Sequence, residues 1–298
     1  MPKWTTADLP PMDGRTVVIT GAGSGIGLIA ARALASAGAS VIAAVRDPAK
    51  ARSALADAAG SVDVRPLDVS DLRSIRAFAD STAGTVDVLV NNAGVMDIPA
   101  QRTADGFDLQ TATNYLGPFV LTNLLADRIT DRVVSVTSQL HRRARLDLDD
   151  LDWRTRAYDP MQAYCDSKLA IVLFSLELQR RLTAAGRPVR SVLAHPGIAT
   201  TALAAHSPAN RINRLRFLLN DPEHGALPVL YAVTQDVPGN AYVGPDGLGS
   251  VKGYPVVRRP GKRGLDADVA RQLWEATAAL TGVGALPAAA WSNNNPNQ

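Results

Sequence analysis

The feature that most constrains the fold is an alternation, over the first two thirds of the chain, of short β-branched runs with longer helical patterns. Such alternation is typical of βαβ units, in which helices join parallel strands and cover both faces of the sheet. The predicted strands are Arg15–Thr20, Ser40–Val45, Val62–Val69, Val86–Asn91, Arg132–Thr137 and Val189–Ala194. Most are apolar throughout, which is expected of strands covered on both faces. Val62–Val69 instead alternates apolar and polar residues, which places it nearer an edge.

The helix predicted over Pro160–Ala185 is marked at both ends. Asp159 is the expected N-cap, Gln162 occupies the capping-box position, and Gly186 follows the last turn. Other predicted elements are a helix over Ile26–Ala37 that Gly38 ends, a short strand near Asn240–Val243 and a helix around Asp266–Leu280. Because no repeat and no linker separates two cores, the 298 residues predict one doubly wound α/β domain, a single parallel sheet (Rossmann fold) with helices on both faces.

Composition excludes several classes of protein. Hydrophobic residues make up 46% and charged residues 20% of the chain, which argues against disorder. Cys165 is the one cysteine, so an internal disulfide and a four-cysteine zinc site are excluded, and no metal site is predicted. No apolar run reaches the length of a membrane span, and the N-terminus lacks the apolar region of a secretory signal. We therefore expect a cytoplasmic protein.

The charge is nearly balanced, with 31 basic and 28 acidic residues spread along the chain. The densest basic clusters are residues 141–145 and 258–263, and neither has the aromatic interleaving or finger spacing of a nucleic-acid binder. Nucleic acid is therefore not an expected partner. Each cluster is either a solvated loop or a contact for an anionic ligand or partner.

A glycine-rich turn joins the first predicted strand to the first predicted helix. The segment is Gly21-Ala22-Gly23-Ser24-Gly25-Ile26-Gly27, directly after Val17-Val18-Ile19-Thr20. Glycine allows a tight turn that brings backbone N–H groups onto a pyrophosphate, and the start of the helix adds about half a positive charge. A plain tight turn is the alternative. The position at the first βα junction favours a dinucleotide site.

The end of the second predicted strand distinguishes the two nicotinamide dinucleotides. An NAD site presents an acidic side chain there to the ribose hydroxyls, whereas a 2′-phosphate pairs with arginine. The segment reads Ala43-Ala44-Val45-Arg46-Asp47, so Val45 stands at the acidic position and Arg46 follows. NADP is favoured over NAD, and NAD becomes the alternative if Asp47 rather than Arg46 faces the ribose. An ordinary surface side chain is the other interpretation of Arg46.

Tyr164 and Lys168 lie four residues apart in the predicted helix Pro160–Ala185, a spacing that places both side chains on one face. A free tyrosine has a pKa of about 10 and is a poor acid–base group at neutral pH. We expect the ammonium to lower that pKa and so to make a proton donor for a nascent alkoxide. The spacing alone also arises by chance in many helices.

Taken together, the motifs resemble those of the short-chain dehydrogenase/reductases, in order from about Asp13 to Val243. The matching elements are Thr20 to Gly27, Asp68-Val69, Asn91-Asn92-Ala93-Gly94, Asn114, Ser138, Tyr164 with Lys168, and Pro196-Gly197. The amino-acid sequence of residues 114–119, 164–170 and 195–197 is similar to that of the branch of retinol dehydrogenases and protochlorophyllide reductases. This branch includes bacterial members of unassigned substrate. The resemblance implies a Rossmann-fold oxidoreductase that uses a nicotinamide cofactor.

The resemblance also implies a catalytic set. Tyr164 would be the acid–base residue, and Lys168 would hold the nicotinamide ribose while depressing the tyrosine pKa. Ser138 would form a hydrogen bond with the substrate oxygen. Asn114 would anchor a water chain that relays protons to Lys168.

The implied cofactor contacts follow the same motifs. They are Gly21, Gly23, Ser24, Gly25, Ile26, Gly27, Arg46, Asp68, Val69, Asn91, Ala93, Gly94, Tyr164, Lys168, Pro196, Gly197 and Thr201. Asp68 and Val69 would flank the adenine, and Asn91 would close its strand beside the adenosine ribose. Thr201 would meet the nicotinamide carboxamide or the phosphates.

Three points qualify the match to the family. Gly23 stands where this branch usually has Asn, so a side-chain contact that stiffens the turn is missing. An insert, Gln139–Met161, separates Ser138 from Tyr164, and we expect it to form part of the pocket rim. Thr137 is an alternative hydroxyl to Ser138, but side chains alternate along a strand and would turn the two opposite ways.

Residues 199–225 are the expected substrate lid, and residues 285–298 are an expected polar tail. Within the lid, the basic amphipathic stretch Ile212–Leu219 has three interpretations, a lid over the pocket, a contact with a membrane surface, or a helix packed on its own core. Family position favours the lid. Relatives commonly form homo-oligomers, dimers or tetramers, but the sequence reveals no interface.

The remaining residues with reactive side chains are expected to be structural. His195 is expected to support the end of its strand, and Cys165 to be a small filler. His141 is expected in a loop, with substrate contact as the alternative because Ser138 is near. An acidic run lacks the pattern of a calcium loop and is expected to be solvated; it comprises Asp147, Asp149, Asp150 and Asp152.

The sequence thus predicts an NADP-dependent oxidoreductase that interconverts a carbonyl compound and its alcohol. The substrate is expected to be largely apolar, because no charged side chain is identifiable for the substrate pocket. A non-catalytic NADP-binding regulatory or scaffold protein is the alternative, and the complete set of Ser138, Tyr164 and Lys168 argues against it. A sugar-nucleotide epimerase uses similar residues, but the chain after Gly197 is short for its larger substrate region.

Overall fold

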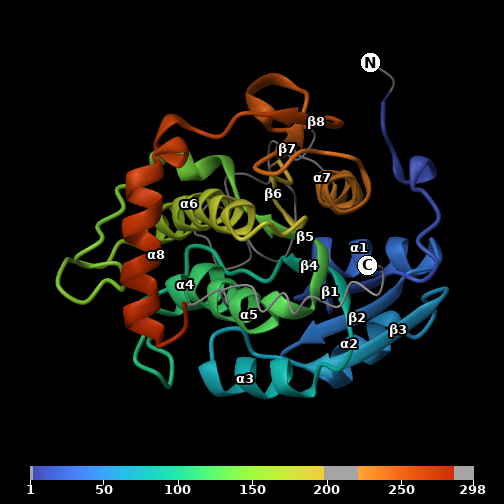
Figure 1. Cartoon of the computed structure of the whole chain (residues 1–298), viewed down its shortest axis with the longest axis horizontal. Coiled ribbons are helices and arrows are strands. Elements are labelled where there is room, and N and C mark those ends of the chain that lie inside the picture. Colours follow the sequence, from blue (N-terminus) through green and yellow to red (C-terminus); the bar gives the residue numbers. More distant parts are fainter. Residues whose placement is uncertain (1–2, 198–220, 285–298) are drawn as a thin grey trace, which may run out of the picture.

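Eight strands form one sheet through the centre of the protein (Figure 1). The structure, a computed structural model, describes residues 3–197 and 221–284. In chain order the strands are β1 (Thr16–Thr20), β2 (Ser40–Val45), β3 (Ser61–Pro66), β4 (Val86–Asn91), β5 (Ile129–Val136), β6 (Arg190–Ala194), β7 (Tyr242–Pro245) and β8 (Pro255–Arg258). Across the sheet the order is β3-β2-β1-β4-β5-β6-β7-β8, and β1 to β7 run parallel. The predicted doubly wound α/β fold is therefore confirmed.

The two edges of the sheet differ from its centre. β3 lies at one edge, as its alternating sequence predicted, and none of its residues is fully buried. β8 forms the other edge and pairs antiparallel with β7, so the prediction of an all-parallel sheet is wrong there. The connecting residues 246–254 are too few for the crossover that a parallel pair requires. They form a hairpin instead, in which the Asp246 N–H donates to Tyr254 O at 2.8 Å.

The predicted strands match the observed ones closely except at one end of β3, at one end of β5 and in β7, which spans Tyr242–Pro245 instead of Asn240–Val243. β3 ends at Pro66 instead of Val69, because Asp68 turns the chain. Its carboxylate accepts hydrogen bonds from the backbone N–H and the hydroxyl of Ser70, at 2.9 and 2.7 Å. β5 begins earlier than predicted, at Ile129, where it already pairs with β4.

Helices cover both faces of the sheet. They are α1 (Gly25–Ser36), α2 (Pro48–Leu55), α3 (Leu72–Ser81), α4 (Leu109–Thr111), α5 (Gly117–Leu125), α6 (Pro160–Ala184), α7 (Pro222–Thr234) and α8 (Ala267–Thr281). Side chains of α3, α5, α6 and α8 pack in one apolar core, and those of α1, α2 and α7 in the other. Figure 1 shows α8 crossing α6, where Trp274 stacks on Phe174 with ring centroids 5.6 Å apart.

The helix α6, which carries Tyr164 and Lys168, is fixed at its first turn. Asp159 accepts the Gln162 N–H at 3.0 Å, and Gly186 has a φ of +65°, so the predicted cap and stop are confirmed. The capping box is not completed, because the Gln162 amide donates to Arg143 O and Asp166 Oδ1 instead. None of the helices in the described part of the chain, α6 included, is long and apolar enough to span a membrane.

Two carboxylates of the acidic run are buried, so the expectation that they are solvated is wrong. Asp150 accepts the backbone N–H of Arg154 at 2.6 Å and that of Arg156 at 3.1 Å. Asp152 accepts the backbone N–H of Asp108 and forms an ion pair with Arg154 at 2.9 Å. The bonds of Asp150 thus fold the long insert before α6 on itself, and the bond from Asp108 attaches the insert to the body of the protein.

We expect Asp150→Ala to destabilise the protein by about 2 kcal/mol, because its buried carboxylate satisfies several backbone N–H groups. Burial raises the pKa of Asp150, but N–H donors from Arg156, Arg154 and Thr155 outweigh this and hold the pKa below its ordinary value. The stabilisation is therefore present at neutral pH and is lost as the pH falls through that lowered pKa. Urea unfolding measures the difference, with the exposed neighbour as control in Asp149→Ala. Equal losses in the two variants would contradict the assignment.

Candidate active site

The predicted cofactor and catalytic residues meet at the carboxyl ends of the central strands. The glycine turn leaves β1, residues 91–94 close β4 and leave it, Ser138 follows β5, and Pro196 follows β6. Between β1 and β4 the order of strands reverses. In open α/β sheets, ligands bind in the crevice at such a switch point.

The glycine turn has the backbone geometry that its sequence predicted. Gly21 and Gly25 have φ angles of +69° and +53°, in the left-handed region that favours glycine. By helix geometry the first N–H groups of α1 have no intrahelical partner, and the Ser24 side chain does not cap them. The start of α1 also lacks acidic side chains, so its electrostatics suit a phosphate.

Gly27 allows α1 to pack directly against the segment that leaves β4. A Cβ at this position would overlap the side-chain amide of Asn92 and would lie 2.5 Å from Gly21 O. Asn92 donates to Thr20 O at 2.9 Å, and Thr20 Oγ1 accepts the N–H groups of Asn92 and Ala93, both at 3.0 Å. The turn is thus a close-packed cradle of backbone, which fits the pyrophosphate of a dinucleotide.

At the end of β2, the arginine and the acid have different surroundings. The Arg46 side chain is exposed and forms no hydrogen bond or ion pair with any described residue. Asp47 instead caps α2, because its carboxylate accepts the Lys50 N–H at 3.0 Å. The unpaired charge at this strand end is therefore positive.

The residues expected near the adenosine lie at the ends of β3 and β4. Asp68 and Val69 follow β3. The side chain of Asn91 is buried and donates to Thr122 Oγ1 of α5 at 3.0 Å, so it fixes α5 while the backbone closes β4.

The four predicted catalytic residues converge. Ser138 is hydrogen-bonded to the Tyr164 hydroxyl. Lys168 Nζ lies 5.7 Å from the centroid of the Tyr164 ring and donates to a backbone carbonyl of β5 at 3.1 Å. A Cβ on Gly94 would lie 3.5 Å from Lys168 Nζ and 3.1 Å from Asn114 Oδ1, so both side chains approach the loop after β4.

Asn114 lies in a π-helical turn, Ala112–Leu116, inserted between α4 and α5. Its side-chain N–H groups donate to Val95 O and Ser167 Oγ, both at 2.9 Å, and its oxygen accepts the Val95 N–H at 2.8 Å. Such π-turns occur frequently at functional sites. The amide thus clamps the loop after β4 onto α6.

Burial dominates the ionisation of the two central groups. It raises the pKa of Tyr164 to about 12, which the hydrogen bond with Ser138 only partly offsets. It also lowers the pKa of Lys168 to about 8. The expected lowering of the tyrosine pKa by the ammonium is not seen, because burial disfavours the phenolate more than the hydrogen bond with Ser138 favours it. Tyr164 is therefore a neutral phenol at pH 7.

Two positioning contacts were not predicted. Thr137 Oγ1 donates to Lys168 O at 2.9 Å and thereby fixes α6 to the chain that leaves β5. Gly117, at the start of α5, lets that helix touch Val69, whose carbonyl oxygen a Cβ would overlap. A glycine inside an apolar helical run was the available signal for this contact.

Other predicted residues are partly outside the description. Pro196 and Gly197 follow β6, and Gly197 has a φ of +79°. Residues 222–225 of the expected lid form the first turn of α7, which packs in the core with α1. The predictions that lie outside the described residues are Thr201, the lid from 199 to 220 with its stretch Ile212–Leu219, and the tail 285–298.

Two histidines and the cysteine are buried. His195 donates from Nε2 to Ser250 O at 3.1 Å and stacks on Tyr242, which supports a structural role. Burial raises the pKa of Cys165 to about 11, in keeping with a small filler. His141 lies in a short 3₁₀ turn rather than a solvated loop.

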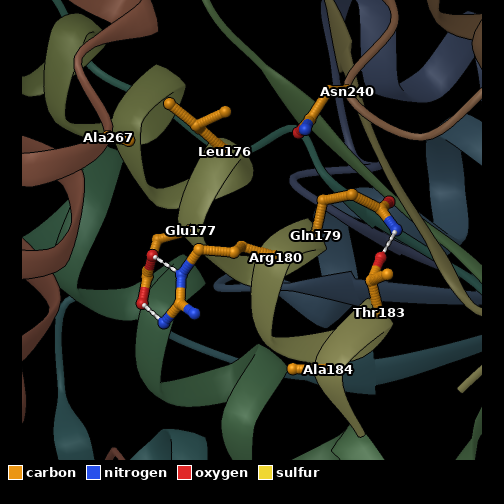
Figure 2. Close-up of a pocket in the computed structure, with 8 residues that line it drawn as sticks. All are labelled: Leu176, Glu177, Gln179, Arg180, Thr183, Ala184, Asn240 and Ala267. Atoms are coloured by element: carbon orange, nitrogen blue, oxygen red, sulfur yellow. Dashed lines mark hydrogen bonds and ion pairs between the residues drawn. The ribbon is translucent and has the colours of Figure 1, made fainter. Parts of the chain in front are cut away.

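Two cavities in the described part of the chain lie at different distances from this constellation. One, of about 440 Å³, is lined by α6 side chains together with Asn240 and Ala267 (Figure 2). Its nearest α6 residue, Leu176, is roughly 18 Å along the helix from Tyr164, so this cavity is separate from the site. The other, of about 310 Å³, brings the two basic clusters together and is lined by His141, Arg142, Gly261, Lys262 and Arg263.

Comparison with known proteins agrees with this geometry. The family model for short chain dehydrogenases matches residues 15–147. Human retinol dehydrogenase 13 is 40% identical over 294 residues, which cover 91% of this chain and 85% of the relative. A crystal structure of an uncharacterized Mycobacterium paratuberculosis protein has a TM-score of 0.86 at 48% identity, covering 96% of this chain and all of the other. A structure named as a gluconate 5-dehydrogenase from Beutenbergia cavernae, with bound NADP, has a TM-score of 0.56 at 28% identity, covering 74% and 90%.

The chain belongs to the short-chain dehydrogenase/reductase family. Within that family it belongs to the retinol dehydrogenase-like branch, as the sequences of its motifs indicated. It is therefore an oxidoreductase that acts on small molecules with a nicotinamide cofactor.

Because Gly27 leaves no room for a side chain, Gly27→Ala is expected to destabilise the protein by about 2–3 kcal/mol. Gly23→Ala is the matched control, because its Cβ would meet Ala51 Cβ at 3.3 Å, a contact that a small shift relieves. Thermal unfolding without added cofactor compares the two variants. A melting temperature equally lowered in both would show that Gly27 is not a special contact.

Proposed function

We propose that this protein interconverts a largely apolar carbonyl compound and its alcohol, with NADP as its cofactor and with Ser138, Tyr164, Lys168 and Asn114 as its catalytic set. One observation carries the proposal. A buried phenol is hydrogen-bonded to a serine and lies beside a buried lysine, at the same edge of the sheet as the glycine turn. A protein that only binds the cofactor has no chemical need for this arrangement.

The cradle and the strand ends fit a dinucleotide. The residues proposed to hold it are Gly21, Gly23, Ser24, Gly25, Ile26 and Gly27 at the pyrophosphate, Asp68, Val69, Asn91, Ala93 and Gly94 along the adenosine and ribose, and Pro196, Gly197, Thr201 and Lys168 at the nicotinamide end. The overlap that any side chain on Gly27 would make supports this assignment, because a glycine at this position of a dinucleotide-binding turn lets the helix pack closely against the turn and the neighbouring strand. When bound, the reduced cofactor supplies a hydride to the carbonyl carbon.

The protein's own side chains supply the proton and the stabilisation of charge. As the carbonyl carbon gains a hydride, its oxygen becomes negative and accepts a hydrogen bond from Ser138. Tyr164 transfers its phenolic proton to that oxygen, which yields a neutral alcohol and a phenolate. Lys168, whose pKa of about 8 lies near neutrality, stabilises the phenolate and returns a proton to it. Asn114 holds the loop and helix that carry these groups.

The preference for NADP rests on the end of β2. Arg46 is exposed and unpaired within the described part, whereas Asp47 is engaged at the start of α2. A guanidinium there favours a 2′-phosphate. The apolar substrate class rests on the catalytic set, which contains no further charged group, and on the similarity to retinol dehydrogenases, whose named substrate is an apolar alcohol.

Tyr164→Phe is expected to lower kcat at least about 100-fold, because it removes the proton donor, while the Kd for NADPH stays nearly unchanged. Oxidation of NADPH is followed with a panel of apolar aldehydes and ketones, and binding by cofactor fluorescence. Tyr115→Phe is the matched control: it removes another buried phenol, bonded to Thr277 at 2.6 Å, and should retain turnover. Equal loss of NADPH binding and turnover in Tyr164→Phe would make that tyrosine structural.

Arg46→Gln is expected to raise the Kd for NADPH at least about tenfold and to leave the Kd for NADH nearly unchanged, because only NADPH carries the 2′-phosphate. Arg52→Gln, which removes an exposed arginine from the neighbouring α2, controls for the change in net charge. Isothermal titration calorimetry with NADPH and with NADH measures the two Kd values. Parallel weakening of the two would remove Arg46 from phosphate recognition.

A further inference from the structure

His141 is a buried side chain whose two ring nitrogens are both hydrogen-bonded. It lies in the 3₁₀ turn Gln139–Arg143, which begins directly after Ser138. Its Nδ1 lies 2.6 Å from Ser138 O, and its Nε2 lies 2.8 Å from the backbone nitrogen of Gly261. The ring therefore connects Ser138, two residues beyond β5, to the segment that follows β8.

These two bonds define the tautomer of the ring. A backbone N–H can only donate, so Nε2 accepts from Gly261, and Nδ1 carries the hydrogen that is donated to the Ser138 carbonyl. Burial lowers the pKa of His141, the bond to Ser138 raises it less, and the charge of Arg142 lowers it further. The neutral ring that this pattern needs is therefore favoured.

Ser138 is held by the same turn at both of its polar groups. Its carbonyl accepts the backbone N–H of His141 at 3.0 Å as well as the ring, and its Oγ accepts the Leu140 N–H at 3.2 Å. Oγ is also hydrogen-bonded to Tyr164, and this bond lowers the pKa of the phenol. The orientation of Ser138 thus influences the acidity of the tyrosine.

We propose that His141 is a positioning residue, which fixes the Ser138 peptide through Nδ1 and anchors it to Gly261 through Nε2, so that the serine hydroxyl keeps its bond to Tyr164. The inference rests on the proposed function, in which that hydroxyl and that phenol face the substrate oxygen. Without the ring, the Ser138 carbonyl loses one donor and the Gly261 N–H is left buried without an acceptor.

Two substitutions separate the two bonds of the ring. In H141N the amide nitrogen is one bond beyond Cγ, as Nδ1 is, so the donor to Ser138 is kept and the acceptor for Gly261 is lost. In H141Q the amide reaches the place of Nε2, so the acceptor is kept and the donor is lost. We expect kcat of H141N to stay within about threefold of wild type and that of H141Q to fall about tenfold or more, with the KM for NADPH unchanged in both.

The pH profile of alcohol oxidation supplies a readout that a folding defect does not move. Loosening of Ser138 weakens the bond that lowers the Tyr164 pKa, so the profile of H141Q is expected to shift to higher pH while that of H141N superimposes on wild type. Tyr242→Phe is the control. Its ring lies 5.8 Å from that of His141, and its hydroxyl has no hydrogen-bond partner among the described residues, so rate and profile should both be retained.

Equal turnover and superimposed profiles for H141Q and H141N would overturn the inference. So would losses in both variants that follow their melting temperatures, because the ring would then be structural. Activity retained by Tyr164→Phe would instead overturn the proposed function. An inactive Tyr164→Phe beside an H141Q that behaves as wild type rejects the positioning role alone.

Discussion

The rest of the site depends on one constraint, the burial of Lys168 of α6 against the end of β5. Lys168 donates from Nζ to Val136 O, and its own carbonyl accepts from the hydroxyl of Thr137. The last residue of β5 and the residue that follows it thus hold the same helical residue, one at its side chain and the other at its backbone. This fixes the rotation and height of α6 over the sheet, and one turn earlier Tyr164 comes into reach of Ser138.

Close contacts at glycines hold together the segments that flank the site. At Gly27 the first helix meets the segment after β4, at Gly94 that segment meets Lys168 and Asn114, and at Gly117 the helix α5 meets the chain after β3. At Gly27 and Gly117 a Cβ would overlap a backbone oxygen, and at Gly94 it would lie 3.1 Å from the Asn114 side chain. The relative positions of these segments therefore depend on close packing.

Local sequence patterns were sufficient to predict the parallel centre of the sheet, the glycine turn and both ends of α6, because each is determined by residues near in the chain. The antiparallel edge strand β8 was missed, since its pairing depends on a hairpin between two short segments. The burial of Asp150 was missed for a different reason. Its N–H donors, Arg154 and Arg156, lie only four and six residues further along the chain, but no sequence pattern marks the turn that brings them to the carboxylate.

The candidate site likewise has features that the local sequence could predict and features that depend on the whole fold. The positions of Tyr164 and Lys168 on one helical face followed from their spacing, but the sign of the tyrosine pKa shift did not, because burial is a property of the whole fold. His141 was expected to be a loop residue. Its second hydrogen bond could not be predicted, because the partner of Nε2, the Gly261 N–H, belongs to the segment after β8, which is distant in the sequence.

The single cysteine has a practical consequence. Cys165 follows Tyr164 in α6, is 2% exposed, and has a pKa raised by burial to about 11. Alkylating reagents attack the thiolate, so they cannot react at this position while the helix stays on the sheet. The rate of alkylation therefore reports how often α6 detaches from the sheet, and the native chain provides this measurement without any introduced label.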